Sequence, residues 1–560
     1  MKKHTIGERV EALRAWMRDK GLAAYIIPTM DPHDSEYLPA HWQTRQWITG
    51  FTGSAGTAIV SLDEAALWTD SRYWLQAEQQ LADTPFVLRR DGVDESIRDW
   101  LGAHVEGRVG YLPVVMPDVL LREYTDGLHV QGFDEDPFNS LWKDRPALPL
   151  SLIERMSDAL AGETAASKLE RIRQWIENRG KVDILLRELS EIAWTLNLRA
   201  DDIPCNPFFI SFLRLCAKGG GVLYVHEEQV SPDVRDYLAS LHIDIEPYGK
   251  APALRFSHSP VAEMRAAKNP TEQEGFRQAH LRDGVAMVKL LRRLDEADLS
   301  TWTELRVDRE LTAIRAEQPG FRGLSFETIV GYGANGAIVH YEPTPETDTP
   351  LQPRGLLLLD SGGHYDCGTT DITRTIPLGP LNDEEKRAFT LVLKGHLQLL
   401  HAVFPAGTTG IQLDALARLA LWREGFDYGH GTGHGVGHRL GVHEGPVQFR
   451  KNCRPDTIHP LVLGQTITVE PGLYMKDKFG VRHENTALVV PAFQSGFGDF
   501  WRLESLTRCP YDLRAIVVEL LTAEERQWLN DYHAQVCRDL LPLLSDPADQ
   551  AWLAKATRAI

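Results

Sequence analysis

The spacing of apolar residues near the start of the chain alternates between helix-like and strand-like patterns. At residues 6–20 apolar side chains recur every three or four positions, which predicts an amphipathic helix that ends at Gly21. A continuous apolar run at residues 23–28 predicts a buried strand directly after it. Residues 65–70 predict another strand, which leads into a helix containing Trp74. Alternating helices and strands indicate an α/β domain.

The same order of elements occurs a second time. Residues 172–180 resemble residues 13–21: each segment ends a helix at a glycine, and an apolar strand follows each. This repetition predicts two copies of one α/β unit. A proline- and acid-rich stretch between them is the expected linker, so we place the first domain at residues 1–150 and the second at residues 151–258.

The remaining residues, 259–560, predict a domain of a different class. Thr271 with Glu274, and Thr301 with Glu304, have the spacing of capping boxes, so each pair is expected to begin a helix. Two apolar strands are expected to end at Asp360 and to begin at Asp371. Helices are predicted at about residues 383–403 and 412–424, and another strand pair carries Glu470 and Glu484. We therefore expect an α+β domain with helices outside an antiparallel sheet.

Composition limits the classes of function. The chain has 560 residues, 43% of them apolar and 25% charged, and a net charge of −18, which argues against a nucleic-acid partner. The six cysteines form no C-x-x-C pair, which favours a reducing compartment. No apolar run approaches the roughly 20 residues of a membrane helix, and charged residues occupy the place of a signal core. We expect a cytoplasmic protein without membrane contact.

Chemistry concentrates in a glycine-rich segment at residues 430–443, H-G-T-G-H-G-V-G-H-R-L-G-V-H, with four histidines in fourteen positions. Acids lie on both sides of it. Asp360 and Asp371 precede it, eleven positions apart, and Glu470 and Glu484 follow it, fourteen positions apart. We interpret these residues as one site.

The charge of these acids favours a metal centre. A single acidic residue is most often solvated surface, but each of these four lies at the end of an apolar strand or beside a glycine or proline turn. Buried carboxylates so close together would repel one another unless cations compensate them. Four carboxylates and one neutral imidazole balance two divalent ions. The oxygen-rich ligand set favours Mn²⁺, with Co²⁺, Fe²⁺ or Zn²⁺ also compatible.

These motifs resemble a known family. The segments D-S-G-G-H-Y-D-C-G-T-T-D-I-T-R-T, H-G-T-G-H-G-V-G, V-H-E-G-P, E-P-G-L-Y and G-V-R-H-E-N are similar to those of the long, three-domain Xaa-Pro aminopeptidases (aminopeptidase P). These enzymes are creatinase-like metallopeptidases with the pita-bread fold. The resemblance spans the whole chain. It implies two creatinase-like α/β domains followed by a pita-bread catalytic domain with a C-terminal extension.

The resemblance also implies a dinuclear metal site and its ligands. These are Asp360, Asp371, His434, Glu470 and Glu484, with Asp371 and Glu484 bridging two divalent ions. A hydroxide held between the ions would attack the scissile carbonyl, which the metals polarise. Glu470 would also carry a proton to the leaving proline nitrogen, which has no hydrogen of its own.

Three histidines receive roles from the same resemblance. His340 and His443 resemble residues that contact the substrate carbonyl and stabilise the charge that develops on it. Either histidine alone would more often be a structural residue, and the motifs around them reverse that expectation. His430 resembles another catalytic histidine, with support of the metal ligands as the alternative.

Further positions are expected to act around the metals or on the substrate. Arg482 and Tyr474 are expected to orient the metal-bound acids and to lie close to the substrate, and Arg72 to contact longer peptides. His438 receives no role. His483 departs from the family pattern, and strand alternation predicts that its side chain points away from the metals.

The resemblance implies peptides with proline in second position as substrates, and a homodimer. Prolidase, which cleaves Xaa-Pro dipeptides, is the main alternative, because it shares the fold and the metal ligands. The repeated N-terminal units and the C-terminal extension favour the aminopeptidase. A non-catalytic pita-bread binding module would have lost ligands, and all five are present in this sequence.

Overall fold

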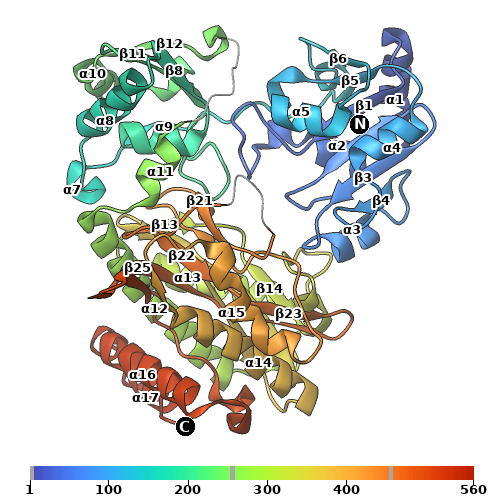
Figure 1. Ribbon diagram of the computed structural model, residues 1–560. Coiled ribbons are helices and arrows are strands. Elements are labelled where there is room, and N and C mark those ends of the chain that lie inside the picture. Colours follow the sequence, from blue (N-terminus) through green and yellow to red (C-terminus); the bar gives the residue numbers. More distant parts are fainter. Residues whose placement is uncertain (1–4, 253–258, 453–457) are drawn as a thin grey trace. The chain divides into compact units, whose positions relative to one another are not determined.

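The computed structural model describes residues 5–252, 259–452 and 458–560, which form two compact units (Figure 1). The first unit contains residues 1–155, 168–204 and 208–259. The second contains residues 156–167, 205–207 and 260–560. The domain boundaries at residues 150 and 258 stay predictions. Mixed α and β structure agrees with the predicted class.

The first sheet of the first unit has the strand order β4-β3-β2-β1-β5-β6. Its helix α1 (Ile6–Lys20) begins at Thr5 with a capping box and ends at Gly21, whose φ of 64° is left-handed. The sheet strands are β1 (Ala24–Pro28), β2 (Thr57–Ser61), β3 (Ala65–Thr69), β4 (Val87–Arg90), β5 (Val109–Tyr111) and β6 (Val130–Gly132). The prediction of a helix followed by a buried strand is confirmed, since all five residues of β1 are buried.

The second sheet of this unit has the order β12-β11-β10-β8. Helix α8 (Ala165–Asn178) precedes Gly180, which also has a left-handed φ, of 63°, and β8 follows. The predicted repetition of helix, glycine and strand is therefore present. The strands are β8 (Asp183–Leu186), β10 (Ser211–Cys216), β11 (Gly221–Val225) and β12 (Ile243–Pro247).

Two helix starts of the second unit differ from the prediction by two residues. Helix α12 (Pro270–Glu296) is capped by Asn269 with Glu272, and α13 (Glu304–Ala316) by Thr303. Proline at the first helical position makes the preceding residue the cap, so Asn269 takes the place predicted for Thr271. Glu304 caps nothing, because its carboxylate accepts the backbone N–H of Tyr332 at 2.7 Å.

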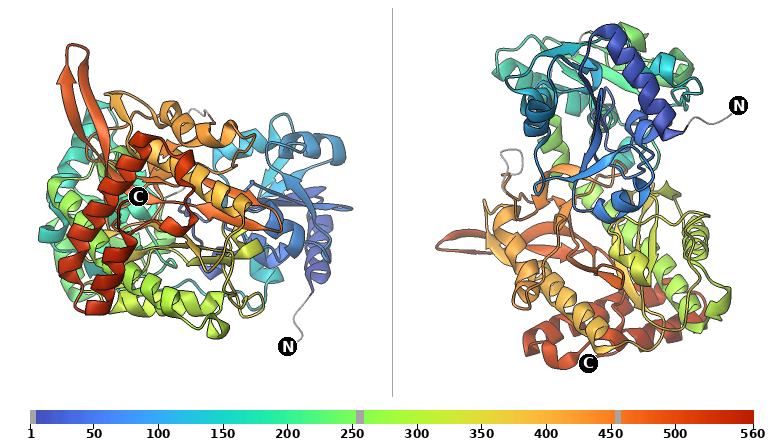
Figure 2. Two further views of the ribbon diagram at one scale, coloured as in Figure 1. Left: turned by 90° about the horizontal axis from the view of Figure 1, so that it is seen from below. Right: turned by 90° about the vertical axis from the view of Figure 1, so that its right-hand side faces the viewer.

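The strands that carry the acids lie in two antiparallel sheets. One has the order β14-β15-β18, from β14 (Ile329–Tyr332), β15 (Leu356–Ser361) and β18 (Ile372–Pro377). The other has the order β19-β26-β25-β22-β20-β21. Its strands are β19 (Val403–Pro405), β20 (Gly433–Gly435), β21 (Glu444–Phe449), β22 (Thr466–Val469), β25 (Asn485–Ser495) and β26 (Gly498–Ser505). The β25–β26 hairpin projects from the second unit (Figure 2).

Helices cover these sheets, as predicted. Helices α14 (Asp383–Leu400) and α15 (Gly410–Trp422) pack on each other, and a short hairpin of β23 (Gly472–Met475) and β24 (Phe479–Arg482) packs against α14. The chain ends in α16 (Ala523–Leu540) and α17 (Pro547–Ala556), whose apolar side chains share a core with α12 and α14.

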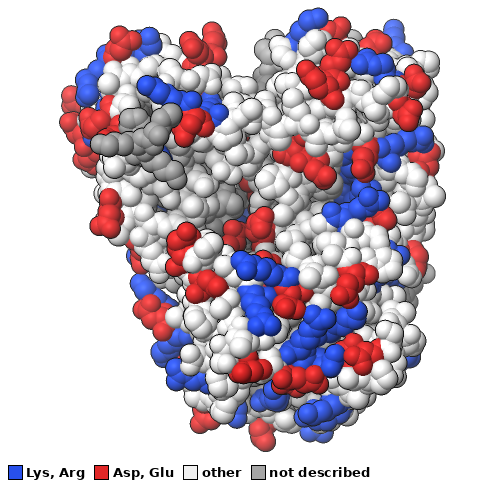
Figure 3. Space-filling model, turned by 180° about the vertical axis from the view of Figure 1, so that it is seen from behind, with Lys and Arg blue, Asp and Glu red and all other residues white. Residues whose placement is uncertain are grey.

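The surface of the chain is charged and mixed. Acidic and basic side chains are interspersed on the face shown in Figure 3. Among the described residues, no helix combines the length and the apolar character that a membrane crossing requires.

Candidate metal centre

Strand ends bring the predicted ligands together. Asp360 is near the end of β15, and Asp371 directly precedes β18, its antiparallel partner. Glu470 directly follows β22 and Glu484 directly precedes β25, so both flank the same end of that strand pair. His434 is the middle residue of β20, which pairs with β22.

Thr373 of β18 helps to join the two sheets at this point. Thr373 Oγ1 donates a hydrogen bond of 2.8 Å to Glu484 Oε2, and the Glu484 backbone N–H donates to the Thr373 carbonyl at 3.1 Å. Thr373 was not among the predicted site residues. Its signal in the sequence is the alternation T-R-T after Asp371, which places Thr373 and Thr375 on one face of β18.

The distances among the ligating atoms suit bound cations. His434 Nε2 lies 3.4 Å from Asp371 Oδ2 and 3.5 Å from Glu470 Oε1. Ligating atoms of Asp371, His434 and Glu484 all lie within 4.8 Å of one another. Two ligands of one ion at about 2.1 Å lie roughly 3 Å apart, so this spacing leaves room for an ion between them.

Hydrogen bonds orient the imidazole of His434. Its Nδ1 lies 2.8 Å from the Gly435 carbonyl and donates to it, which turns Nε2 toward the acids. Its backbone N–H donates to Thr468 Oγ1 at 3.1 Å. Thr468 is a second residue that the sequence analysis missed.

Burial makes the ionised carboxylates of the cluster unfavourable unless cations are bound beside them. Asp360, Asp371 and Glu484 are 7%, 3% and 1% exposed. Burial raises the pKa of Asp360 and that of Glu484, and neighbouring carboxylates raise both further. Burial also raises the pKa of Glu470 to about 7. The cluster therefore attracts positive charge.

The negative charge of the acids also changes the pKa of His434. Burial lowers its pKa, but the carboxylates of Asp371 and Glu470 outweigh burial and raise the pKa to about 9. An imidazole beside so many acids takes up a proton when no other cation is present. A divalent ion would replace that proton.

One oxygen atom of the cluster shows that a metal ion would fit there. Asp360 Oδ1 is buried and has no hydrogen-bond partner among the described residues. An unbonded carboxylate oxygen in the interior is strongly unfavourable unless a cation binds it. The four acids and one histidine therefore fit an oxygen-rich site for hard divalent ions.

Arg482 and Tyr474 lie beside the cluster, and their roles there stay predictions. Arg482 donates from Nη2 and Nε to Asp360 Oδ2 at 2.7 and 3.1 Å. Its Nη1 donates to the Tyr474 hydroxyl at 2.7 Å, and His430 Nε2 lies 2.8 Å from the same hydroxyl. His430 thus reaches Asp360 through Tyr474 and Arg482. Its role, catalytic or supporting, stays a prediction.

The other two predicted histidines lie around the cluster. The His443 ring packs edge-on against that of His434, with centroids 4.3 Å apart. His340 is partly buried in the turn after β14, and the carbonyl of the preceding residue, Val339, accepts a bond of 3.3 Å from Arg482. The catalytic roles of both histidines stay predictions.

Three further residues considered in the sequence analysis make other contacts. His483 lies against Phe389 of α14, 4.3 Å between ring centroids, which confirms that it points away from the acids. His438 is buried and bonds the Cys367 carbonyl. Arg72 belongs to the first unit, where Asp70 binds its guanidinium with two bonds of 2.8 Å. Its contact with peptides stays a prediction.

Comparison with known families agrees with this site. Residues 274–491 match metallopeptidase family M24, and residues 499–560 match the C-terminal region of that peptidase family. Residues 9–131 and 144–257 each match the creatinase/prolidase N-terminal domain.

Similar proteins share the full length of the chain. A probable Xaa-Pro aminopeptidase P of Colletotrichum graminicola is 35% identical, and the alignment covers 99% of each chain. Aminopeptidase P2 of Arabidopsis thaliana is 36% identical over 100% of this chain and 89% of its own. The crystal structure of an X-prolyl aminopeptidase from Caenorhabditis elegans, described as cytosolic with a di-nuclear active site, superposes over 100% of both chains with a TM-score of 0.94 and 31% identity.

Proposed function

Since the chain belongs to metallopeptidase family M24, with creatinase/prolidase N-terminal domains, we propose that it is a Xaa-Pro aminopeptidase. It would release the first residue from peptides whose second residue is proline. The observation that carries the proposal is the buried cluster of four acids and His434, in which Asp360 Oδ1 has no partner among the described residues.

The cofactors proposed are two divalent ions per chain, with Mn²⁺ preferred because oxygen ligands predominate. Asp360, Asp371, His434, Glu470 and Glu484 would hold them. When bound, the ions would supply Lewis-acid polarisation of the scissile carbonyl and would lower the pKa of the attacking water. Arg482 supports this arrangement by holding Asp360 in one orientation.

The chain's own groups supply the remaining steps. Glu470 would take a proton and return it to the leaving proline nitrogen, as this leaving group requires. His340 and His443 would donate hydrogen bonds to the substrate carbonyl and stabilise its developing charge. Arg72 would contact longer peptides.

The test compares two substrates, an Xaa-Pro dipeptide and an Xaa-Pro-Pro tripeptide, with metal-free protein before and after addition of Mn²⁺. We expect release of the first residue from the tripeptide, only with metal. Repeating the assay with Co²⁺, Fe²⁺ or Zn²⁺ in place of Mn²⁺ ranks these ions by the rate of cleavage that each supports. Asp371→Asn is the matched inactive control.

Two other outcomes would overturn the proposal. Cleavage confined to the dipeptide would identify a prolidase. If no divalent ion supports cleavage of either peptide, the chain is a non-catalytic binding module.

The proposal extends to assembly and location. We propose a homodimer in a reducing cytoplasm, in line with the description of the Caenorhabditis elegans relative as cytosolic. Sedimentation equilibrium of the full chain tests the dimer, and a species of about 63 kDa would contradict it. Cell fractionation tests the location.

A further inference from the structure

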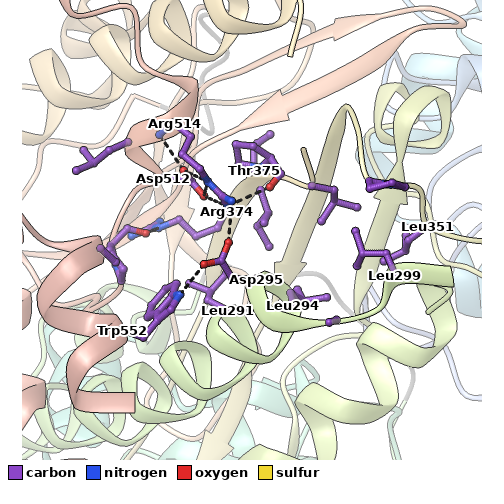
Figure 4. Close-up of a pocket in the computed structure, with 18 of the residues that line it drawn as sticks. Leu291, Leu294, Asp295, Leu299, Leu351, Arg374, Thr375, Asp512, Arg514 and Trp552 are labelled. Carbon is purple, nitrogen blue, oxygen red and sulfur yellow. Dashed lines mark hydrogen bonds and ion pairs between the residues drawn. The ribbon is translucent and has the colours of Figure 1, made fainter. Parts of the chain in front are cut away.

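A cavity of about 550 Å³ lies in the second unit beside strand β18. Its walls come from the end of α12 and the turn after it, from residues 351–353, from β18, from the segment at residues 510–514, and from α17 with the residues after it (Figure 4). This volume falls in the range of small-molecule sites. None of the predicted ligands, and no other predicted site residue, is among the residues that line it.

Strand β18 contributes to both this cavity and the metal centre. Thr373 and Thr375 direct their hydroxyls to Glu484 and Arg482. Arg374, Thr375 and Ile376 all line the cavity, and the Arg374 guanidinium also donates to the Glu484 carbonyl. The cavity therefore backs onto the strand that follows Asp371.

One part of the cavity wall is apolar and the rest is polar. The apolar part is formed by the buried side chains of Leu291, Leu294 and Leu299, with Leu351 and Ile376 beside them. Figure 4 shows the labelled leucines around the open space. This apolar part favours a ligand with a hydrocarbon or aromatic body.

The charges around this interior are not balanced. Four basic residues, Arg374, Arg514, Lys555 and Arg558, line the cavity against three acidic ones, Asp295, Asp298 and Asp512. The lining thus carries one net positive charge in a chain of net charge −18. An anion is attracted to this part of the surface.

The acids of the lining are already engaged. Arg514 binds Asp512 at 2.6 Å and Asp295 at 2.7 Å, and Trp552 Nε1 donates to Asp295 at 3.2 Å (Figure 4). Asp298 accepts the hydroxyl of Ser300 at 2.7 Å. Arg514 is therefore held by two acids of the lining and is not the base that an anionic ligand would meet.

Two basic side chains remain for a ligand. Lys555 and Arg558 are exposed on and just after α17, and within the described ranges neither has an acidic partner within 4 Å. Arg374 adds a buried positive charge whose hydrogen-bond partners are carbonyls, an amide and a hydroxyl. The positive charge at the rim and in the wall therefore selects a negative head group.

We propose that this cavity binds an amphipathic monoanion, with its apolar body among the leucines and its carboxylate or sulfonate at Lys555 and Arg558. The probe is 8-anilinonaphthalene-1-sulfonate, whose fluorescence rises in apolar surroundings. We expect the full-length protein to bind one equivalent, and octanoate to displace it. Octylammonium, with the same chain and the opposite charge, should not displace it.

Two variants locate the binding. Ala556→Trp fills the cavity from α17 at a partly buried position and should abolish saturable binding. Lys555→Glu with Arg558→Glu alters only exposed residues and should weaken binding at least ten-fold. The control, Arg526→Glu with Arg538→Glu, makes the same charge change on α16 outside the lining and should leave affinity unchanged.

Clear results would overturn the proposal. Equal binding by the wild type, Ala556→Trp and the Lys555/Arg558 variant would place the probe elsewhere. Equal displacement by octanoate and octylammonium would show that the site does not select an anion.

Discussion

Arg482 binds Asp360 through one oxygen only. Both Nε and Nη2 donate to Oδ2, at 3.1 and 2.7 Å, and Oδ1 is left without a partner among the described residues. The guanidinium thus compensates part of the carboxylate charge while keeping one oxygen available for a cation. This relationship explains how a buried acid can be held rigidly and still act as a ligand.

Replacing Arg482 by lysine should therefore weaken metal binding. An ammonium keeps the charge but cannot donate to Asp360 and Tyr474 in the same fork geometry. We expect Arg482→Lys to lower Mn²⁺ affinity by about 10- to 100-fold, measured by titration calorimetry. Tyr474→Phe, which keeps the bonds to Asp360, should have a smaller effect. Unchanged Mn²⁺ affinity in Arg482→Lys would refute the supporting role.

Removing one charge from the cluster should stabilise the metal-free protein. Burial first, and then Asp371 and Asp360, raise the pKa of Glu484, so its ionised form is disfavoured in the folded state. A carboxyl whose folded pKa is raised contributes stability below its unfolded pKa and loses that contribution as pH rises. At pH 8 with chelator, Glu484→Gln should melt a few degrees above the wild type.

Added Mn²⁺ should reverse this order, because the wild type keeps all its ligands and gains more from binding. Thermal unfolding with chelator and with Mn²⁺ checks both results. Glu384→Gln is the control, since Glu384 is exposed and paired with Lys478 at the surface. A lower melting temperature for metal-free Glu484→Gln would contradict repulsion within the cluster.

His443 should contribute to turnover rather than to metal binding. Its ring lies edge-on to that of His434, and the sequence motif around it gives it a role toward the substrate rather than toward the metals. We expect His443→Ala to lower kcat by about 10²- to 10³-fold, as loss of a donor to a developing oxyanion does. Metal content should stay at the wild-type level. His443→Asn, which retains an N–H donor, should recover part of the rate, and full activity of His443→Ala would exclude the role.

Arg374 should connect the C-terminal region to the ligand strands. Its guanidinium donates to the carbonyls of Glu484 and Cys509 at 2.7 and 2.8 Å, and to the Tyr532 hydroxyl at 3.0 Å. Arg374→Met leaves these buried acceptors unsatisfied, so we expect a loss of several kcal/mol in unfolding free energy. Mn²⁺ affinity should fall as well, because the backbone of Glu484 is released.

Milder and matched variants keep this prediction testable if Arg374→Met does not fold. Tyr532→Phe removes one hydroxyl and should lower the unfolding free energy by about 1 kcal/mol. Arg514→Met changes a half-exposed arginine of the neighbouring segment and should leave Mn²⁺ affinity unchanged. Equal Mn²⁺ affinity in the Arg374 and Arg514 variants would disprove the connection.

His533 should make the protein sensitive to acid. Burial first, and then Arg374, lower the pKa of this histidine to about 3, and its Nε2 accepts the Tyr511 backbone N–H at 3.0 Å. The unfolded chain therefore binds more protons than the folded chain between about pH 6.5 and pH 3. Stability from the neutral imidazole is complete above pH 6.5 and is lost as pH falls.

His533→Gln keeps an acceptor and does not titrate. Between pH 7 and pH 5 we expect the wild type to lose about 2 kcal/mol more unfolding free energy than this variant. Denaturant unfolding at the two pH values measures the difference, with the exposed His104→Gln as control. Parallel losses in wild type and His533→Gln would contradict the effect of burial.

Local features of the chain were predictable because their signals lie within a few residues. Helix α1 with its end at Gly21, the apolar strand β1 and the antiparallel strands around Asp360 follow from side-chain periodicity and glycine conformation. The helix starts predicted at Thr271 and Thr301 lie two residues away, at Asn269 and Thr303, since several polar residues compete for each cap. The ligand residues were identified from motif resemblance together with charge balance.

Tertiary structure decided which of these residues meet. The sequence by itself determined the types of element, the α+β class of the catalytic region and the acids that need a cation. It could not show that Thr373 binds Glu484 across 111 positions, or that Arg482 leaves Asp360 Oδ1 unbonded. Such contacts depend on how separate sheets pack, and packing is set by side chains distributed over the whole chain rather than by any local pattern. The cavity beside β18 arises in the same way, from five segments that are far apart in sequence.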